Sequence, residues 1–287
     1  MSYQENDVND NRVIIKDREL TYEVNEEMKV LRTNIQFSGT DTKVIVMTSC
    51  IGGEGKSTTS MNLAISLAEL HKKVILIDAD LRKSVMERNL KGGSGKKGLA
   101  HFLSGQASIA DVILPTNIRG LSLIMTGDVV PPNPAELLAS PLLDKTLKVM
   151  RDNYDYIIID APPLGLVVDA AILARVADGA CIVMQAGEIK YRFAQSVKEQ
   201  LESSGCKILG VILNKVKYEK HGAYYGKYYG KYYGKYYGHY YGNEDDQAGG
   251  GPRIAGETVK EPVARNSRRS STKKYDMVIE PDMNGRR

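Results

Sequence analysis

The sequence has no run of about 18 consecutive apolar residues, the length that a membrane-spanning helix needs, and therefore predicts no transmembrane segment. Its opening residues, MSYQENDVND, lack both the basic start and the apolar stretch of a signal peptide. Cysteine is scarce, and Cys50, Cys181 and Cys206 show no spacing typical of a metal site or a disulfide framework. We therefore expect a cytoplasmic protein whose cysteines are small buried side chains.

The chain also lacks a large excess of positive or negative charge. The net charge is +4, and the lysines of residues 217–242 account for an excess of that size, so the rest of the chain is nearly neutral. A chain of 287 residues with 42% hydrophobic content can form one domain with a core, plus tails. We expect a flexible N-terminus over residues 1–20, a folded domain over 21–216, a tyrosine-rich tail over 217–242 and a disordered tail over 243–287.

Short apolar segments alternate with helical patterns along the folded domain. An amphipathic pattern predicts a helix from Glu26 to Phe37, and long helical patterns cover residues 136–152 and 191–204. The segments expected to form strands are 43–49, 74–78, 121–125, 156–160, 180–184 and 208–214. This alternation predicts an α/β fold, with a doubly wound, mostly parallel sheet that is flanked by helices on both faces.

The tyrosine-rich tail repeats a simple unit, AYYGKYYGKYYGKYYGHYYG, with a glycine at every fourth position. It has too little apolar surface to offset the entropy of ordering, so we expect it to be flexible. Taken alone, it is either an idle low-complexity tract or a store of phosphoryl acceptors. The candidate acceptors are Tyr224, Tyr225, Tyr228, Tyr229, Tyr232, Tyr233, Tyr236, Tyr237, Tyr240 and Tyr241.

A glycine-rich loop, SCIGGEGKSTT, joins the first expected strand of the core to a helical pattern. Backbone amides of such a loop can surround a β-phosphate, while Lys56 reaches the β- and γ-phosphates and the Ser57 hydroxyl binds magnesium. Cys50 stands where the usual GxxxxGK[ST] motif has its first glycine. The residues expected to bind the nucleotide are Gly52, Gly53, Glu54, Gly55, Lys56, Ser57 and Thr58.

Carboxylates end two of the apolar strands, where a parallel sheet presents its ligand-binding edge. Asp78 and Asp80 lie two residues apart in VILIDADLR, and Asp160 ends YIIID. Residues two apart in a strand point the same way, so both can face one phosphate site. Magnesium bound to ATP needs few protein oxygens, and one or two carboxylates with Ser57 are enough.

From about Glu26 to Asn214 the sequence resembles the bacterial tyrosine kinases (BY-kinases), of the type found as a separate cytoplasmic chain beside a membrane activator. TSCIGGEGKSTT is similar to the family's Walker A motif, VILIDADLR to its Walker A′ and YIIIDAPP to its Walker B. Gly52 and Ser84 stand where the family often has proline. The resemblance extends to the tyrosine tail and implies a P-loop NTPase of the deviant Walker type that uses ATP and Mg2+ to phosphorylate tyrosine.

The resemblance also implies roles for the site residues. Lys56 and Ser57 bind the phosphates and the metal, Asp78 and Asp160 hold the magnesium, and Asp80 is a candidate to accept the tyrosine proton. The residues themselves do not separate Asp78 from Asp80 as the base. A nearby carboxylate favours this step because a tyrosine hydroxyl has a pKa near 10.

Two further residues have open roles. Arg82 either stabilises transferred charge or is a solvated residue that opens a helix. Asn214 resembles the asparagine that contacts adenine in related deviant Walker ATPases. The tail implies autophosphorylation, in the same subunit or, as the family favours, in a neighbouring one.

The family's ring-forming ExxRxxR motif appears here as Glu26, Lys29 and Arg32. Lysine cannot make the bidentate fork of arginine, so we expect ring contacts that are weaker or differently made. The resemblance implies a homo-oligomer such as an octameric ring that phosphorylation dissolves, a transmembrane activator that recruits the chain to the inner face of the membrane, a cognate phosphotyrosine phosphatase, and control of capsule or exopolysaccharide synthesis.

Two alternatives remain open. A MinD- or ParA-like ATPase shares the fold and the phosphate motifs, but that class has a lysine at the position of Ile51. A nucleic-acid-binding P-loop protein is the other alternative, because tyrosines interleaved with lysines can stack on bases. We favour the kinase and expect no nucleic-acid partner.

Overall fold

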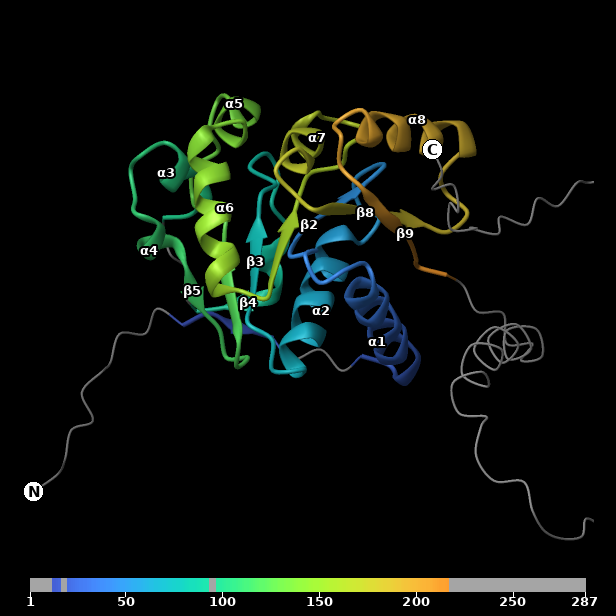
Figure 1. Cartoon of the computed structure of the whole chain (residues 1–287), viewed down its shortest axis with the longest axis horizontal. Helices are drawn as coiled ribbons and strands as arrows, with labels where there is room; N and C mark the ends of the chain where they lie inside the picture. Colours follow the sequence, from blue (N-terminus) through green and yellow to red (C-terminus); the bar gives the residue numbers. More distant parts are fainter. Residues whose placement is uncertain (1–11, 17–19, 93–96, 217–287) are drawn as a thin grey trace, which may run out of the picture. The chain divides into compact units, whose positions relative to one another are not determined.

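The computed structural model describes residues 12–16, 20–92 and 97–216. The tyrosine-rich tail and the segment expected to be disordered therefore lie outside the described residues. Within the described chain the core is a seven-stranded sheet in the order β5-β6-β3-β7-β2-β8-β9 (Figure 1). Six of these strands are parallel, and β5 (Leu114–Pro115) pairs antiparallel with β6 at one edge.

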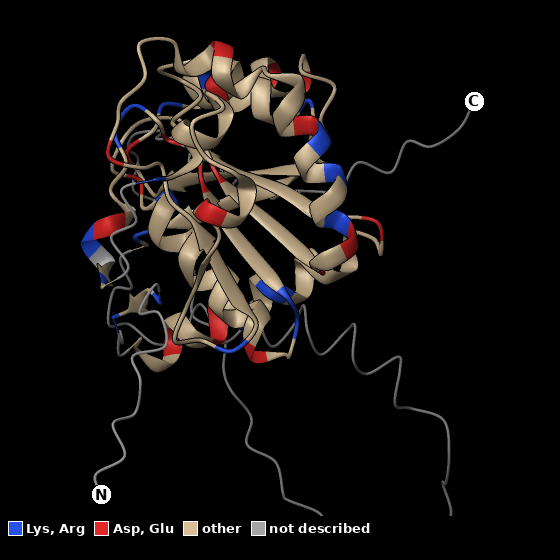
Figure 2. Cartoon of the chain, turned by 90° about the vertical axis from the view of Figure 1, so that its left-hand side faces the viewer, with Lys and Arg blue, Asp and Glu red and all other residues tan. Residues whose placement is uncertain are grey.

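The six parallel strands are those that the sequence predicts, with small differences at their ends. They are β2 (Val44–Ser49), β3 (Val74–Asp78), β6 (Leu121–Ile124), β7 (Tyr156–Asp160), β8 (Gly179–Gln185) and β9 (Ile208–Asn214). In Figure 2 the strands are tan along most of their length, because charged residues gather on helices and loops. This is the pattern of strands that are covered on both faces.

Helices cover both faces of the sheet (Figure 1). In β2, Val44 and Val46 face one apolar cluster, whereas Ile45 and Met47 face the other. The second cluster includes residues of α1 (Tyr22–Phe37) and α2 (Lys56–Glu69). The first includes residues of α3 (Leu99–Leu103), α4 (Ile109–Val112), α5 (Pro134–Leu138), α6 (Pro141–Asn153), α7 (Asp169–Ala174) and α8 (Tyr191–Glu202).

Two helices differ from the sequence-based expectation. The pattern over residues 136–152 forms α5 and α6 rather than one helix, because Pro141 starts a new helix and Ser140 caps it. Proline has no N–H for the preceding turn and disfavours helical geometry in the residue before it. Helix α1 starts at Tyr22 rather than Glu26, because the Thr21 side chain accepts a hydrogen bond from the Val24 N–H.

A short strand near the N-terminus differs from the flexible segment expected over residues 1–20. Strand β1 (Ile14–Ile15) pairs antiparallel with β4 (Leu90–Lys91), which follows the short helix η1 (Met86–Asn89). Val13 and Ile15 are buried in the same cluster as α2. Burial of these two apolar side chains offsets the entropy of ordering the segment.

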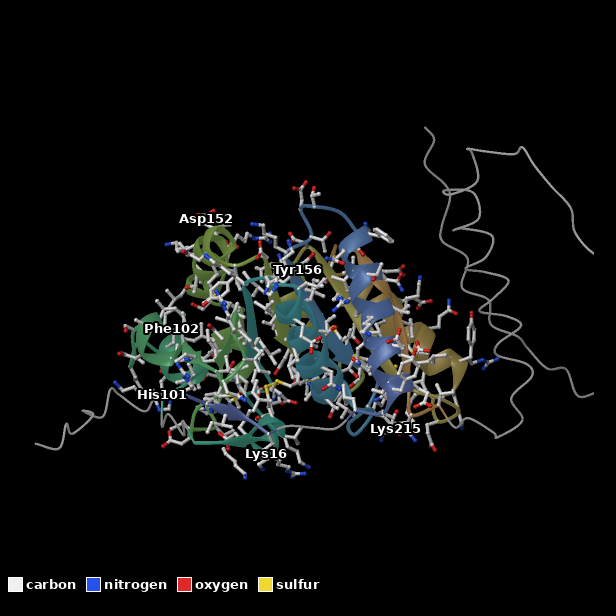
Figure 3. The ribbon with its side chains drawn as sticks, turned by 90° about the horizontal axis from the view of Figure 1, so that it is seen from below. Lys16, His101, Phe102, Asp152, Tyr156 and Lys215 are labelled. Atoms are coloured by element: carbon white, nitrogen blue, oxygen red, sulfur yellow. The ribbon has the colours of Figure 1, made fainter. Side chains whose placement is uncertain are left out.

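Figure 3 shows that His101 of α3 and Lys215, which follows β9, lie at opposite ends of the domain.

Cys50, Cys181 and Cys206 are free and buried, as expected. No helix among the described residues is long and apolar enough to cross a membrane.

Candidate active site

The loop between β2 and α2 has the backbone geometry of an anion-binding turn. Gly53 and Gly55 have φ values of 85° and 91°, which residues with a side chain rarely adopt. A Cβ at Gly55 would also lie 2.0 Å from Nδ2 of Asn214, so this position has no room for a side chain. Gly55 caps α2, and the loop amides and the helix N-terminus together form a site suited to a phosphate.

The Glu54 side chain fixes this loop from inside. It is buried, and its carboxylate accepts hydrogen bonds from the Ile51 N–H at 2.8 Å and the Gln185 N–H at 3.0 Å. The loop is thereby tied to the end of β8. The sequence indicates only the backbone of Glu54 as part of the site, because nothing in the motif reveals a partner 131 residues away.

Lys56 is paired with Asp160 at the carboxyl end of the sheet. Its Nζ lies 2.9 Å from Oδ2 of Asp160, and the two side chains are only 7% and 1% exposed. The same Nζ donates to the Ser57 hydroxyl at 3.3 Å, and the Ser60 hydroxyl donates to Oδ1 of Asp160 at 2.8 Å. The structure therefore brings together three residues that the sequence predicted: Lys56, Ser57 and Asp160.

Asp78 lies directly beside Asp160, because these residues are paired in the register of β3 and β7. Burial and repulsion from Asp160 raise the pKa of Asp78 to about 7, and the opposing effects of Ser84 and Lys56 are smaller. The Ser84 hydroxyl donates to Oδ2 of Asp78. Two adjacent carboxylates thus face one ammonium group, which leaves an excess of negative charge when both are ionised.

These oxygens fit a magnesium ion that is bound together with nucleotide phosphates. Ser57, Asp78 and Asp160 offer the hard oxygen ligands that magnesium prefers, and the ion would offset the excess charge of the two carboxylates. Among the described residues, no three His, Cys, Asp or Glu side chains gather in a way that could hold a metal. The arrangement suits an ion that completes its coordination with phosphate and water rather than with an all-protein cage.

Asp80 and Arg82 follow β3 and are both held by hydrogen bonds. The Asp80 N–H donates to Oδ1 of Asp78 at 3.1 Å, and Oδ1 of Asp80 accepts from the Lys83 N–H at 3.1 Å. Arg82 makes a bidentate pair with Asp169, from Nε at 2.8 Å and from Nη2 at 3.0 Å. Asp169 is fully buried at the start of α7, and the sequence does not indicate its role because no motif links it to Arg82.

Asn214 lies at the same edge, and its Nδ2 donates to the Glu54 carbonyl at 2.8 Å. The three residues expected at an oligomer interface lie on α1, the helix on which the sequence predicted them. Lys29 pairs with Glu26 at 2.7 Å, and Nη1 of Arg32 donates to the Ser66 carbonyl and hydroxyl of α2. The candidate tyrosine acceptors lie outside the described residues.

Comparison with known proteins shows the family of the chain. A family profile described as an AAA domain matches residues 42–203. Tyrosine-protein kinase CpsD of Streptococcus agalactiae is 49% identical over 204 residues, which cover 69% of this chain and 89% of that protein. Tyrosine-protein kinase YwqD of Bacillus subtilis (strain 168) is 39% identical over 201 residues, which cover 69% of this chain and 84% of that protein.

Solved structures agree with this placement. The kinase domain of the Escherichia coli tyrosine kinase ETK superposes with a TM-score of 0.62 at 28% identity, covering 70% of this chain and 80% of that domain. The cell division ATPase MinD of Pyrococcus furiosus superposes with a TM-score of 0.51 at 26% identity, covering 62% and 74%. The MinD-like alternative thus shares the fold more distantly. The chain belongs to the bacterial tyrosine kinases, a family with the P-loop NTPase fold.

Proposed function

We propose that the protein uses Mg2+ and ATP to phosphorylate the tyrosine cluster of its own C-terminal tail. The observation that carries the proposal is the register of Asp78 beside Asp160, with Lys56 Nζ 2.9 Å from Asp160. One cation and two carboxylates thus lie near the start of α2, the helix that follows the glycine-rich loop. Phosphoryl transfer needs mainly alignment and charge neutralisation, which these groups can supply.

In this proposal each site residue has a separate role in nucleotide binding or catalysis. The amides of Gly53 to Gly55 bind the β-phosphate, and Lys56 exchanges Asp160 for the β- and γ-phosphates. Ser57, Asp78 and Asp160 would hold Mg2+, which would neutralise charge on the phosphates. Asp78 or Asp80 accepts the proton of the attacking tyrosine hydroxyl; Asp78 ends β3, and Asp80 follows it by two residues.

The position of β9 supports the tail as the acceptor. Asn214 ends β9 in contact with the phosphate-binding loop, and Tyr224 follows it by ten residues (224 − 214). At roughly 3.3 Å per extended residue, this length reaches about 30 Å, enough for the same site or for that of a neighbouring subunit. We favour transfer to a neighbour within a homo-oligomer such as a ring.

A labelling experiment tests the proposal. Wild-type protein is incubated with γ-labelled ATP and Mg2+, beside Lys56→Met and a variant in which all ten tail tyrosines are phenylalanine. We expect label on the wild-type tail and none on either variant. Release of free phosphate with unlabelled protein would instead identify an ATPase.

Transfer between subunits needs a mixture of two defective chains. Full-length Lys56→Met supplies the acceptor tail, and an active chain truncated after Val216 supplies the site. Label on the Lys56→Met chain is the expected result, whereas an unlabelled partner would restrict transfer to a single subunit. Each phosphate adds about −1.5 to −2 charges, so phosphorylation should reverse the charge of the tail.

The family resemblance supports a transmembrane activator, recruitment to the inner face of the membrane, a cognate phosphatase and a role in capsule or exopolysaccharide synthesis. The activator is the part of this proposal that can be tested directly. Co-purification with a membrane protein, followed by ATPase assays with and without it, should show stimulation by that partner.

A further inference from the structure

Lys215 has an unusual backbone conformation at the point where β9 meets the phosphate-binding loop. Its φ is 55°, in the left-handed region that few residues with a side chain adopt. Such a conformation costs free energy and persists only where the surrounding structure holds it. The contacts of the Lys215 side chain therefore need an explanation.

The ammonium of Lys215 is bound to the loop and to β8 at once. Nζ donates to the Gly53 carbonyl at 2.6 Å and to Oε1 of Gln185 at 2.9 Å. The Gln185 N–H in turn donates to the Glu54 carboxylate at 3.0 Å. Together with the Asn214 bond to the Glu54 carbonyl, these contacts hold two consecutive loop carbonyls from the side of β9.

Fixing these carbonyls also fixes the amides of the same peptide units. A trans peptide is planar, and its C=O and N–H point in opposite directions. The Gly53 carbonyl belongs to the same unit as the Glu54 N–H, and the Glu54 carbonyl to the same unit as the Gly55 N–H. Contacts that turn the carbonyls toward β9 therefore turn these two N–H groups away from it, toward the space in front of the loop.

We propose that Lys215 is a positioning residue for the nucleotide, whose ammonium orients the Gly53–Glu54 peptide so that its N–H is ready for the β-phosphate. The inference rests on the proposed function, because it takes the loop amides as phosphate ligands. It assigns Lys215 no contact with the nucleotide. The strained backbone of Lys215 is the cost of bringing its side chain back over the loop.

Three substitutions at Lys215 separate the effect of its ammonium group from the effect of its strained backbone. Lys215→Met keeps the strained φ and removes the donor, whereas Lys215→Gly removes the donor and relieves the strain. Lys215→Arg keeps a charged donor. Lys207→Met is the control for lost charge, because Lys207 immediately precedes β9, at the end opposite Lys215.

The readout is the affinity for ADP by calorimetry, which requires no phosphoryl transfer and is informative even if the tail is not the substrate. We expect the Met and Gly variants to bind ADP about threefold to tenfold more weakly, equivalent to about 0.6–1.4 kcal/mol, the range of the net contribution of a typical hydrogen bond. Arg should restore most of the affinity, and Lys207→Met should match wild type. In kinase assays, KM for ATP should rise by the same factor with kcat nearly unchanged.

Two results would overturn the proposal. Wild-type affinity in Lys215→Gly would show that the ammonium does nothing for the loop, and equal weakening by Lys207→Met would reduce the effect to general charge. Melting curves without nucleotide check that every variant is folded.

Discussion

The ammonium of Lys56 lies 2.9 Å from the carboxylate of Asp160, so the lysine expected to bind phosphate is held by an aspartate expected to bind the metal. Both groups are buried, and each lacks full solvation without the other. In the proposed function a nucleotide with its metal would replace both partners, since phosphate would pair with Lys56 and the cation with Asp160. The pair keeps the charges of the site in place until that exchange.

Breaking this pair on one side should destabilise the fold as well as abolish activity. Lys56→Met leaves Asp160 unpaired beside Asp78, and loss of one partner from a buried pair typically costs about 3–5 kcal/mol. Adding Asp160→Asn should restore much of the stability but no kinase activity. Denaturant unfolding measures the free energy of unfolding of the single and the double variant. Lys148→Met removes one partner of an exposed pair on α6 and is the nearly neutral control. Additive losses in the double variant would contradict the coupling.

The raised pKa of Asp78 predicts how stability depends on pH without nucleotide. Its folded-state pKa of about 7 exceeds the unfolded value near 4, so its contribution is fully present below about pH 4 and is lost as pH rises to about 7. Asp78→Asn mimics the protonated form and should escape this loss. The melting temperature of the variant relative to wild type should rise from pH 5 to pH 8, by about 2–4 °C for each kcal/mol.

A matched control for this experiment is Asp152→Asn, which changes an exposed aspartate of α6 (Figure 3). Its difference from wild type should show no comparable rise with pH. A constant difference for Asp78→Asn across the whole range would mean that burial and Asp160 do not shift the titration of Asp78.

The bidentate pair of Arg82 and Asp169 predicts non-additive effects on catalysis. If Arg82 acts by holding the segment after β3 against α7, then Arg82→Met and Asp169→Asn should lower kcat by similar factors. The double variant should be little worse than either single one, because both remove the same interaction. A far greater loss in Arg82→Met than in Asp169→Asn would assign Arg82 to the transferred phosphate instead.

Ser84 should tune Asp78 through the hydroxyl that it donates. This hydrogen bond favours the ionised carboxylate, so Ser84→Ala should raise the pKa of Asp78 further. The acidic limb of the rate profile should then move to higher pH at subsaturating Mg2+. Ser84→Thr keeps a hydroxyl and should behave like wild type, whereas an unchanged profile in the alanine variant would refute the role of Ser84.

The sequence predicted the parts of the site that follow from local pattern. Asp78 and Asp160 end apolar runs that could only be buried strands, and the parallel arrangement then brought them to one edge. Lys56 and Ser57 were identified by the glycine-rich loop between a strand and a helix. The Ser140–Pro141 pair also indicates the division into α5 and α6, but the helical spacing of apolar residues continues across this pair and favoured one long helix.

The remaining features depend on contacts between distant segments. Asp169 lies 87 residues from Arg82, and Lys215 lies 162 residues from Gly53. No periodicity or spacing encodes such pairs, since each arises from the way in which the sheet brings strand ends together. The same holds for β1 and β5, which are too short to give an alternating pattern and form only because neighbouring strands supply their hydrogen bonds.

Strand β5 forms one edge of the sheet, the position at which a strand of another chain could pair with it. It has only two residues, and its Pro115 offers no N–H, while the Pro115 carbonyl already accepts a hydrogen bond from the Val13 N–H at 2.9 Å. An incoming strand would find neither a donor nor a free acceptor at this residue. This terminus of the sheet therefore protects the protein against strand-by-strand polymerisation, the route by which exposed sheet edges lead to aggregates.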